Sequence, residues 1–213
     1  MEDVLDVYKQ PYDEKRPVVC MDESSKQLIK ETRIAIPASP GKSARYDAEY
    51  ERNGTCNIFL NFEPLKGKRR VKITEHRKKT DWAYFMKEIV DKDYPHAEKI
   101  VIVMDNLNTH AGSSLYETFA PAEAKRILNK LEIHYTPKHG SWLNMAEIEF
   151  SHLSRQCLDR RIPDKETFVR EVSEWSKQRN KENAAVDWQF TTADARIKLK
   201  KLYPVLGNKG HNL

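Results

Sequence analysis

A short apolar run that stops at an aspartate constrains the fold of this chain most strongly. Residues 100–104 are five consecutive apolar residues rich in β-branched side chains, and Asp105 follows them directly. A run of this length predicts a strand that is buried on both faces. Asp105 then stands at the C-terminal end of the strand, where ligands and catalytic groups collect in open α/β sheets. The sequence therefore predicts an α/β fold with a candidate site at this edge of the sheet.

A second strand repeats this pattern. Residues 17–21 are a short apolar run that leads into Asp22 and Glu23. Two explanations are open: Asp22 belongs to the same site as Asp105, or it accepts backbone hydrogen bonds in the following turn. The presence of two such strands in one chain favours a shared site. If the first strand continues, Glu23 points to the opposite face, so it is a secondary candidate.

Length and composition allow one sizeable core. The chain has 213 residues and a net charge of +5, which is compatible with a polyanionic partner without identifying one. Its three cysteines lie far apart, which argues against a disulfide framework or a zinc site. The N-terminus is acidic and no apolar run reaches membrane-spanning length. We therefore expect a cytoplasmic protein without a membrane segment.

The first third of the chain predicts strands separated by an irregular excursion. Residues 1–16 are expected to be a peripheral lead-in, because prolines there and at position 17 limit regular structure. Residues 31–54 show little periodicity and predict a long surface excursion. Residues 55–63 and 69–75 are typical of the two strands of a hairpin. The pattern as a whole indicates a mixed sheet with helices packed on it.

Helices are predicted from apolar spacing in the rest of the chain. Thr80 is expected to cap a helix whose buried face consists of Trp82, Phe85, Met86, Ile89 and Val90. A further helix is expected at 120–130, and a short strand at 132–135. Asp164 is expected to cap a structural helix that covers the sheet. Residues 193–202 form a basic helix that either contacts DNA or shields the domain.

The densest basic cluster lies on and beyond the hairpin. It consists of Lys66, Lys68, Arg69, Arg70, Lys72, Arg77, Lys78 and Lys79. One explanation is a solvated edge strand protected by charge. The other is a surface that contacts phosphate groups. Composition does not choose between them.

An amphipathic helix carries two further acids. Its apolar stripe consists of Leu143, Ala146, Phe150, Leu153 and Cys157. Glu147 and Glu149 flank this stripe on opposite sides, and either can reach a site at the edge of the sheet. Periodicity does not choose between them, and a glutamate beside a packed stripe is usually solvated.

Three segments together resemble a known family. They are MDE at 21–23, VMDNLNTH at 103–110 and YTPKHGSWLNMAEIEF at 135–150. This set resembles the catalytic signature of DDE transposases, within them the bacterial insertion-sequence branch of the mariner-like superfamily. Residues 187–204 also resemble the tail of that branch, so the similarity extends from about Tyr12 onward. Three motifs in the right order are far more specific than any one of them.

The resemblance implies a ribonuclease-H-like fold over residues 17–213, with a mixed five-stranded sheet flanked by helices. It places Asp22 on the first strand, Asp105 on the fourth and the third acid on the helix after Gly140. Family spacing selects Glu147 over Glu149 as that acid. The extra length between the second and third acids is expected to be a loop or helix inserted at 112–122.

The implied activity is phosphodiester hydrolysis at the ends of a mobile element, followed by transfer of the 3′-OH into target DNA. Two Mg²⁺ ions, for which Mn²⁺ can substitute, are expected as cofactors. We expect Asp22 to bridge both ions, Asp105 to hold one and Glu147 the other. The implied partners are element-end and target DNA, with two copies of the chain in an active complex on the bacterial nucleoid. Alternatives are a nuclease with a cellular role and an inactive remnant that only binds DNA or a partner.

Relatives also carry helix-turn-helix modules, for which residues 1–16 are too short. We therefore expect the chain alone to bind DNA weakly and without end specificity, and a separate DNA-reading subunit is compatible with this. The expected DNA contacts are Lys68, Arg69, Arg70, Arg77, Lys78, Lys79, Asn106, Asn108, His110, Lys138 and His139. For the asparagines and His110, an ordinary function in turns is the alternative.

Overall fold

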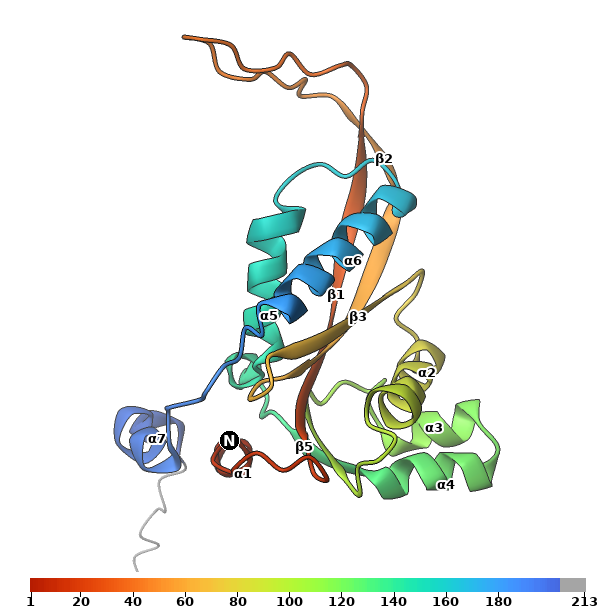
Figure 1. Cartoon of the computed structure of the whole chain (residues 1–213), viewed down its shortest axis with the longest axis vertical. Coiled ribbons are helices and arrows are strands. Elements are labelled where there is room, and N and C mark those ends of the chain that lie inside the picture. Colours follow the sequence, from red (N-terminus) through yellow and green to blue (C-terminus); the bar gives the residue numbers. More distant parts are fainter. Residues whose placement is uncertain (204–213) are drawn as a thin grey trace, which may run out of the picture.

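A five-stranded mixed sheet forms the centre of the molecule, shown in Figure 1. The computed structural model describes residues 1–203, so the last residue of the predicted tail motif, Pro204, lies outside the described range. The strands are β1 (Val18–Glu31), β2 (Tyr50–Glu63), β3 (Lys68–Thr74), β4 (Ile100–Met104) and β5 (Leu131–Tyr135). Their order is β3-β2-β1-β4-β5, with β1 antiparallel to β2 and parallel to β4. The prediction of a mixed five-stranded sheet is confirmed.

Strand β1 is much longer than predicted. Its parallel pairing with β4 ends at Cys20 and Val103, whereas its antiparallel pairing with β2 continues as far as Glu31 and Tyr50. The expectation that the first strand ends at Met21 is therefore wrong. The strand continues through polar residues because β2 supplies backbone partners beyond the point where β4 has ended. Asp22 lies where one neighbour stops and the other goes on.

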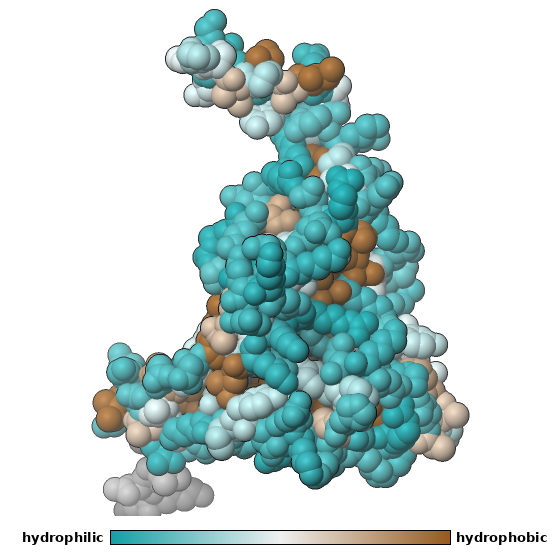
Figure 2. Space-filling model, viewed as in Figure 1, coloured by the Kyte–Doolittle hydropathy of each residue, from teal (hydrophilic) through white to brown (hydrophobic). Residues whose placement is uncertain are grey.

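The predicted surface excursion is a narrow arm that leaves the body of the molecule (Figure 1). It covers residues 32–49, since β1 and β2 take the remainder of the predicted 31–54 segment. Two isolated bridges, Ile36 to Arg45 and Ser39 to Lys42, hold its two sides together. Figure 2 shows hydrophobic residues on this arm. Ile34, in the same segment, is almost fully exposed.

Helices cover both faces of the sheet. One face carries α1 (Glu2–Tyr8), α5 (Ala146–Leu153), α6 (Lys165–Lys181) and α7 (Thr192–Lys198). The other carries α2 (Lys79–Glu88), α3 (Gly112–Thr118) and α4 (Pro121–Lys130). Short 3₁₀ and π turns occupy Ile89–Asp93, Ser141–Leu143, Ser154–Leu158 and Lys200–Leu202. Alternate residues of β4 enter the two cores, so this strand is buried on both faces as predicted.

The helix predictions hold with small shifts at the ends. All five residues of the predicted apolar face are buried, although Ile89 and Val90 lie in the π turn that follows α2. Thr80 is not its cap: the helix begins at Lys79, and the backbone N–H of Lys78 donates to the Asp81 carboxylate at 2.8 Å. Asp164 caps α6 as predicted, because its carboxylate accepts from the Thr167 N–H at 2.7 Å. The expected insertion at 112–122 contains α3.

The N-terminal segment is not the peripheral lead-in that was expected. Helix α1 places Val4 and Leu5 fully in the core, and Tyr8 donates from its hydroxyl to the backbone O of Leu143 at 2.7 Å. Thr192 of α7 donates to the Asp6 carboxylate at 2.7 Å. Within residues 1–203, no helix combines the length and the apolar character needed to cross a membrane.

The burial of α1 predicts a large cost for shortening Leu5. Leu5→Ala removes a fully buried side chain and should lower the free energy of unfolding by about 2–5 kcal/mol. Leu202→Ala is the matched control, because Leu202 is 66% exposed and its loss should cost less than about 0.5 kcal/mol. Urea denaturation followed by circular dichroism measures both. Equal values for the two variants would mean that α1 is not part of the folded core.

Candidate active site

The register between β1 and β4 brings two aspartates together. The last parallel pair is Cys20 and Val103, and Asp22 and Asp105 stand two residues further along their chains. Residues two apart on a strand share a face. Since Cys20 and Val103 both belong to the core beneath α5, the two aspartates are directed toward that helix.

The start of α5 is tied to β1 next to Asp22. The side-chain amide of the buried Asn144 donates to the backbone O of Met21 at 2.9 Å, and its Oδ1 accepts from the Ala146 N–H at 3.1 Å. The acidic helix is thereby held beside the strand that carries the first aspartate. Sequence reasoning used Asn144 only as part of a motif and missed this function.

One open pocket of about 320 Å³ collects the three predicted acids. It is lined by Asp22, Glu23, Ser24, Arg77, Asp105, Leu107, Glu147 and Phe150. The structure thus brings Asp22, Asp105 and Glu147 to the same concavity. Glu149 does not line it.

Asp22 is held in an environment that disfavours its charge. Burial raises its pKa to about 7, and the neighbouring Glu147 and Asp105 carboxylates act in the same direction. The backbone N–H of Glu23 donates to Asp22 Oδ1 at 2.7 Å and partly offsets these effects. Such a carboxylate gains most from a nearby cation.

His110 is buried, so its prediction as a DNA contact is wrong. Its Nδ1 lies 2.6 Å from Asp105 Oδ1, its Nε2 lies 3.5 Å from Glu23 Oε2, and its ring stacks on Trp82. Burial lowers its pKa, but the contacts with Asp105 and Glu23 outweigh this and raise it to about 9. These contacts favour the charged imidazole, and His110 lies where it orients the Asp105 carboxylate. The Asp-to-His spacing in the loop after β4 was visible in the sequence, but not its burial.

Glu23 and Arg77 form the other wall of the pocket. The continuing strand turns Glu23 to the face opposite Asp22, as expected, where it meets His110. The Arg77 guanidinium lies 3.8 Å from Glu23 Oε1 and is more than half exposed. This leaves a cationic side chain at the edge of the acidic pocket.

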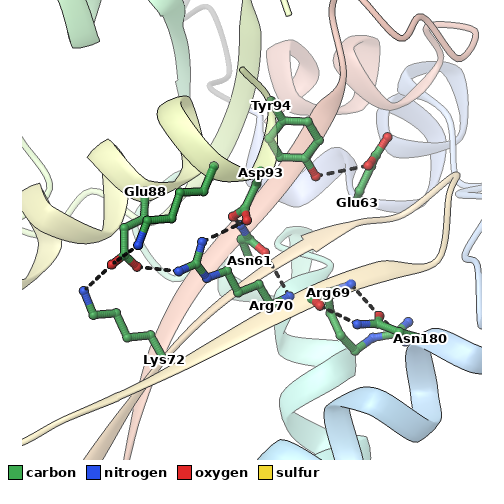
Figure 3. Close-up of polar contacts among 10 residues, drawn as sticks. Asn61, Glu63, Arg69, Arg70, Lys72, Glu88, Asp93, Tyr94 and Asn180 are labelled. Carbon is green, nitrogen blue, oxygen red and sulfur yellow. Dashed lines mark hydrogen bonds and ion pairs between the residues drawn. The ribbon is translucent and has the colours of Figure 1, made fainter. Parts of the chain in front are cut away.

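Glu149 and Arg69 are buried together away from the pocket. Glu149 is fully buried and contacts Arg69 Nε at 2.7 Å and Arg179 Nη2 at 2.9 Å. The Arg69 side chain is fully buried as well, so the prediction that it contacts DNA is wrong. Its backbone and guanidinium bind Asn180, as Figure 3 shows.

Some of the other predicted DNA contacts form salt bridges within the protein, and the rest are exposed. Arg70 is engaged with Glu88 at 2.6 Å and Asp93 at 2.9 Å (Figure 3), so it is unavailable for DNA without breaking both pairs. Lys79 contacts Glu117 at 2.9 Å. The exposed ones are Lys68, Arg77, Lys78, Asn106, Asn108, Lys138 and His139. For these exposed residues, contact with DNA stays a prediction.

The donor set of the pocket is suited to a hard divalent cation. Carboxylate oxygens are the ligands that Mg²⁺ and Mn²⁺ prefer. Across residues 1–203, neither Asp22 nor Glu147 has a salt-bridge partner, although both face like charges. In the same range, no three His, Cys, Asp or Glu side chains already stand close enough to enclose one ion. The residues therefore fit ions that keep water or substrate oxygens in their coordination shell.

The raised pKa of Asp22 predicts a pH-dependent cost to folding. When a carboxyl has a higher pKa in the folded than in the unfolded chain, the free energy of unfolding falls as pH rises toward the folded pKa, which is here about 7. Asp22→Asn removes this cost. Its stability relative to the wild type, measured by urea denaturation in EDTA, should therefore grow on the order of 2–3 kcal/mol from pH 5 to pH 8. The exposed Asp159→Asn is the control, and a pH-independent difference for Asp22→Asn would contradict the assignment.

Comparisons with known proteins agree with this geometry. A family model described as the DDE superfamily endonuclease matches residues 17–169. The structure of the Mos1 mariner paired-end complex with Mn is 15% identical, with 85% of this chain and 54% of that chain covered and a TM-score of 0.56. The Mos1 transposase paired-end complex with the left transposon end is 14% identical, with 85% and 55% covered and a TM-score of 0.57. No curated protein sequence matches the chain.

These two likenesses establish the ribonuclease-H-like fold, and the chain spans about half the length of the structures it matches. The family model covers well over half of the chain, including Asp22, Asp105 and Glu147. The family resemblance predicted from the three motifs is confirmed: the chain belongs to the DDE endonuclease superfamily.

Proposed function

We propose that this chain is the catalytic domain of a DNA transposase, which cleaves phosphodiester bonds at element ends and transfers the 3′-OH into target DNA. The observation that carries the proposal is the single pocket lined by Asp22, Asp105 and Glu147 in a chain of the DDE endonuclease superfamily. Of the two similar structures, one is a Mos1 mariner paired-end complex and the other a Mos1 transposase paired-end complex with the left transposon end, which supports DNA as the substrate here.

The three acids are proposed to hold two Mg²⁺ ions, with Mn²⁺ able to substitute. Both other carboxylates act on Asp22, so Asp22 would contact both ions, with Asp105 on one and Glu147 on the other. When bound, such ions neutralise charge on the phosphate and activate water or a 3′-OH as nucleophile. The solved structure that contains Mn supports the choice of cation.

The chain's own cations orient the acids and the substrate. His110 holds one oxygen of Asp105 at 2.6 Å and leaves its other oxygen for a ligand. Arg77, at the rim of the pocket, is proposed to hold a non-bridging oxygen of the phosphate, since its guanidinium is exposed and directed by Glu23. Both residues also contact Glu23.

Five further polar residues are exposed in the loops after β3, after β4 and before α5. They are Lys78, Asn106, Asn108, Lys138 and His139. We propose that they guide the DNA toward the acids, with Lys68 at the far end of β3 contributing charge. Two copies of the chain in an active complex, a separate DNA-reading subunit and action on the bacterial nucleoid belong to the same proposal.

The acids are tested by cleavage and strand transfer on precleaved element ends with Mg²⁺ or Mn²⁺. Asp105→Asn and Glu147→Gln should each lower the rate by at least roughly 100-fold, because each removes charge stabilisation from the transition state. Glu174→Gln, at an exposed position of α6, should keep the wild-type rate. Cleavage without transfer would favour a nuclease with a cellular role, and no reaction by the wild type would favour an inactive remnant.

Metal binding can be measured without DNA. Titration with Mn²⁺, followed by electron paramagnetic resonance, should show two bound ions for the wild type. Asp22→Asn should weaken both, since Asp22 is the acid shared between them, whereas Asp159→Asn should weaken neither. Unchanged binding by Asp22→Asn would remove Asp22 from the metal site.

A further inference from the structure

Glu149 is a fully buried carboxylate that the proposed chemistry does not use. Its Oε2 lies 2.7 Å from Nε of Arg69, and its Oε1 accepts from Nη2 of Arg179 at 2.9 Å. We call these three residues the anchor cluster. They join three elements: Glu149 is on α5, Arg69 on β3 and Arg179 on α6. Buried charges are costly unless they are paired, so the three side chains hold one another in place.

Arg69 is itself immobilised by its surroundings. The Asn180 side chain pairs with the Arg69 backbone, accepting from its N–H and donating to its carbonyl O, both at 2.8 Å (Figure 3). Arg69 Nη2 donates to the backbone O of Ala184 at 2.8 Å, and its guanidinium lies over the Phe62 ring. Glu149 is therefore paired with a cation that is fixed to the edge strand of the sheet.

Helix α5 depends on such contacts for its orientation. It has eight residues, its N-cap residue Met145 makes no side-chain capping hydrogen bond, and a π turn at Ser154–Leu158 follows it. A helix this short has little stability of its own. Asn144 fixes where it begins. Its buried residues are Ala146, Leu153 and Glu149, and Glu149 is the one whose directional polar contacts can fix the rotation of the helix about its axis.

The contacts of Glu149 also determine the direction of Glu147, because both glutamates lie on α5. Residues two apart on an α-helix differ by roughly 200° in direction. With Glu149 held toward Arg69 and Arg179, Glu147 faces the opposite way, into the pocket. Across residues 1–203, the Glu147 carboxylate itself has no hydrogen bond or salt bridge that would direct it.

We propose that the anchor cluster is a positioning device that sets the rotation of α5 and so holds Glu147 in the acid pocket. The inference rests on the proposed metal site. It makes Glu149, Arg69 and Arg179 positioning residues rather than catalytic ones, and it links the hairpin β2–β3 and α6 to the geometry of the third acid.

An effect of the anchor cluster on protein stability can be separated from its effect on the position of Glu147, because apolar side chains often replace a buried ion triad without loss of stability. The test variant is Arg69→Met/Glu149→Leu/Arg179→Met. It should unfold within a few degrees of the wild type, yet bind Mn²⁺ roughly 10- to 100-fold more weakly, the effect typical of lost support around a metal ligand. Its rate of strand transfer should fall by a similar factor with unchanged KM for DNA. The control is Lys177→Met/Glu174→Leu, an exposed ion pair on α6 whose removal should change neither property.

A second measurement reports the rotation directly and requires no metal. Nitroxide labels on Glu147→Cys and on the exposed Tyr84→Cys of α2 give a distance distribution by pulsed electron resonance. The distribution should be narrow with the anchor cluster intact and broadened or shifted in the triple variant. If the triple variant does not fold, Arg179→Lys takes its place, since it keeps the charge but loses the planar pairing geometry.

A folded variant with wild-type Mn²⁺ affinity and an unchanged distance distribution would overturn the inference. A wild type that neither binds Mn²⁺ nor cleaves DNA would instead overturn the proposed function. In that case the label distances alone decide whether the anchor cluster sets the rotation of α5.

Discussion

The parallel pairing of β1 with β4 is the constraint on which the site depends. Three residue pairs, ending at Cys20 and Val103, fix the register in which Asp22 and Asp105 stand at equivalent positions. A shift of one residue would turn one aspartate to the opposite face of the sheet. The register is held because residues on both sides of β4 are buried, each set in its own core. Core packing thus brings Asp22 and Asp105 together at one edge of the sheet.

The sequence predicted elements that carry strong periodicity and missed those that depend on distant partners. β4 and the buried face of α2 were predictable, because five apolar residues in a row and helical spacing are local signals. The continuation of β1 beyond Asp22 was not, since its polar residues are strand only by virtue of pairing with β2. Helix α1 has apolar residues on one face, but seven residues are too few to indicate a helix without the core that it covers.

The candidate site divides in the same way. Asp22 and Asp105 were candidates from the sequence, because each directly follows an apolar run, whereas periodicity left Glu147 and Glu149 equivalent. What separates them is the burial of Glu149 between Arg69 and Arg179, both remote in the chain. Arg69 and His110 were predicted to contact DNA because the sequence shows that a residue is basic but not which acidic residue it contacts in the fold. Each instead neutralises a carboxylate inside the fold.

The distribution of charge around the pocket explains why its acids suit a cation ligand. His110 and Arg77 both contact Glu23, and His110 also lies 2.6 Å from Asp105. Arg69 and Arg179 are committed to Glu149 on the far side of α5. Within the described part of the chain, Asp22 and Glu147 are therefore left without a cationic partner, and burial makes this costly for Asp22. Two structural glutamates thus occupy three of the protein's own cations: Glu23 contacts Arg77, and Glu149 contacts Arg69 and Arg179. In the proposed function, this leaves Asp22 and Glu147 available to a metal ion.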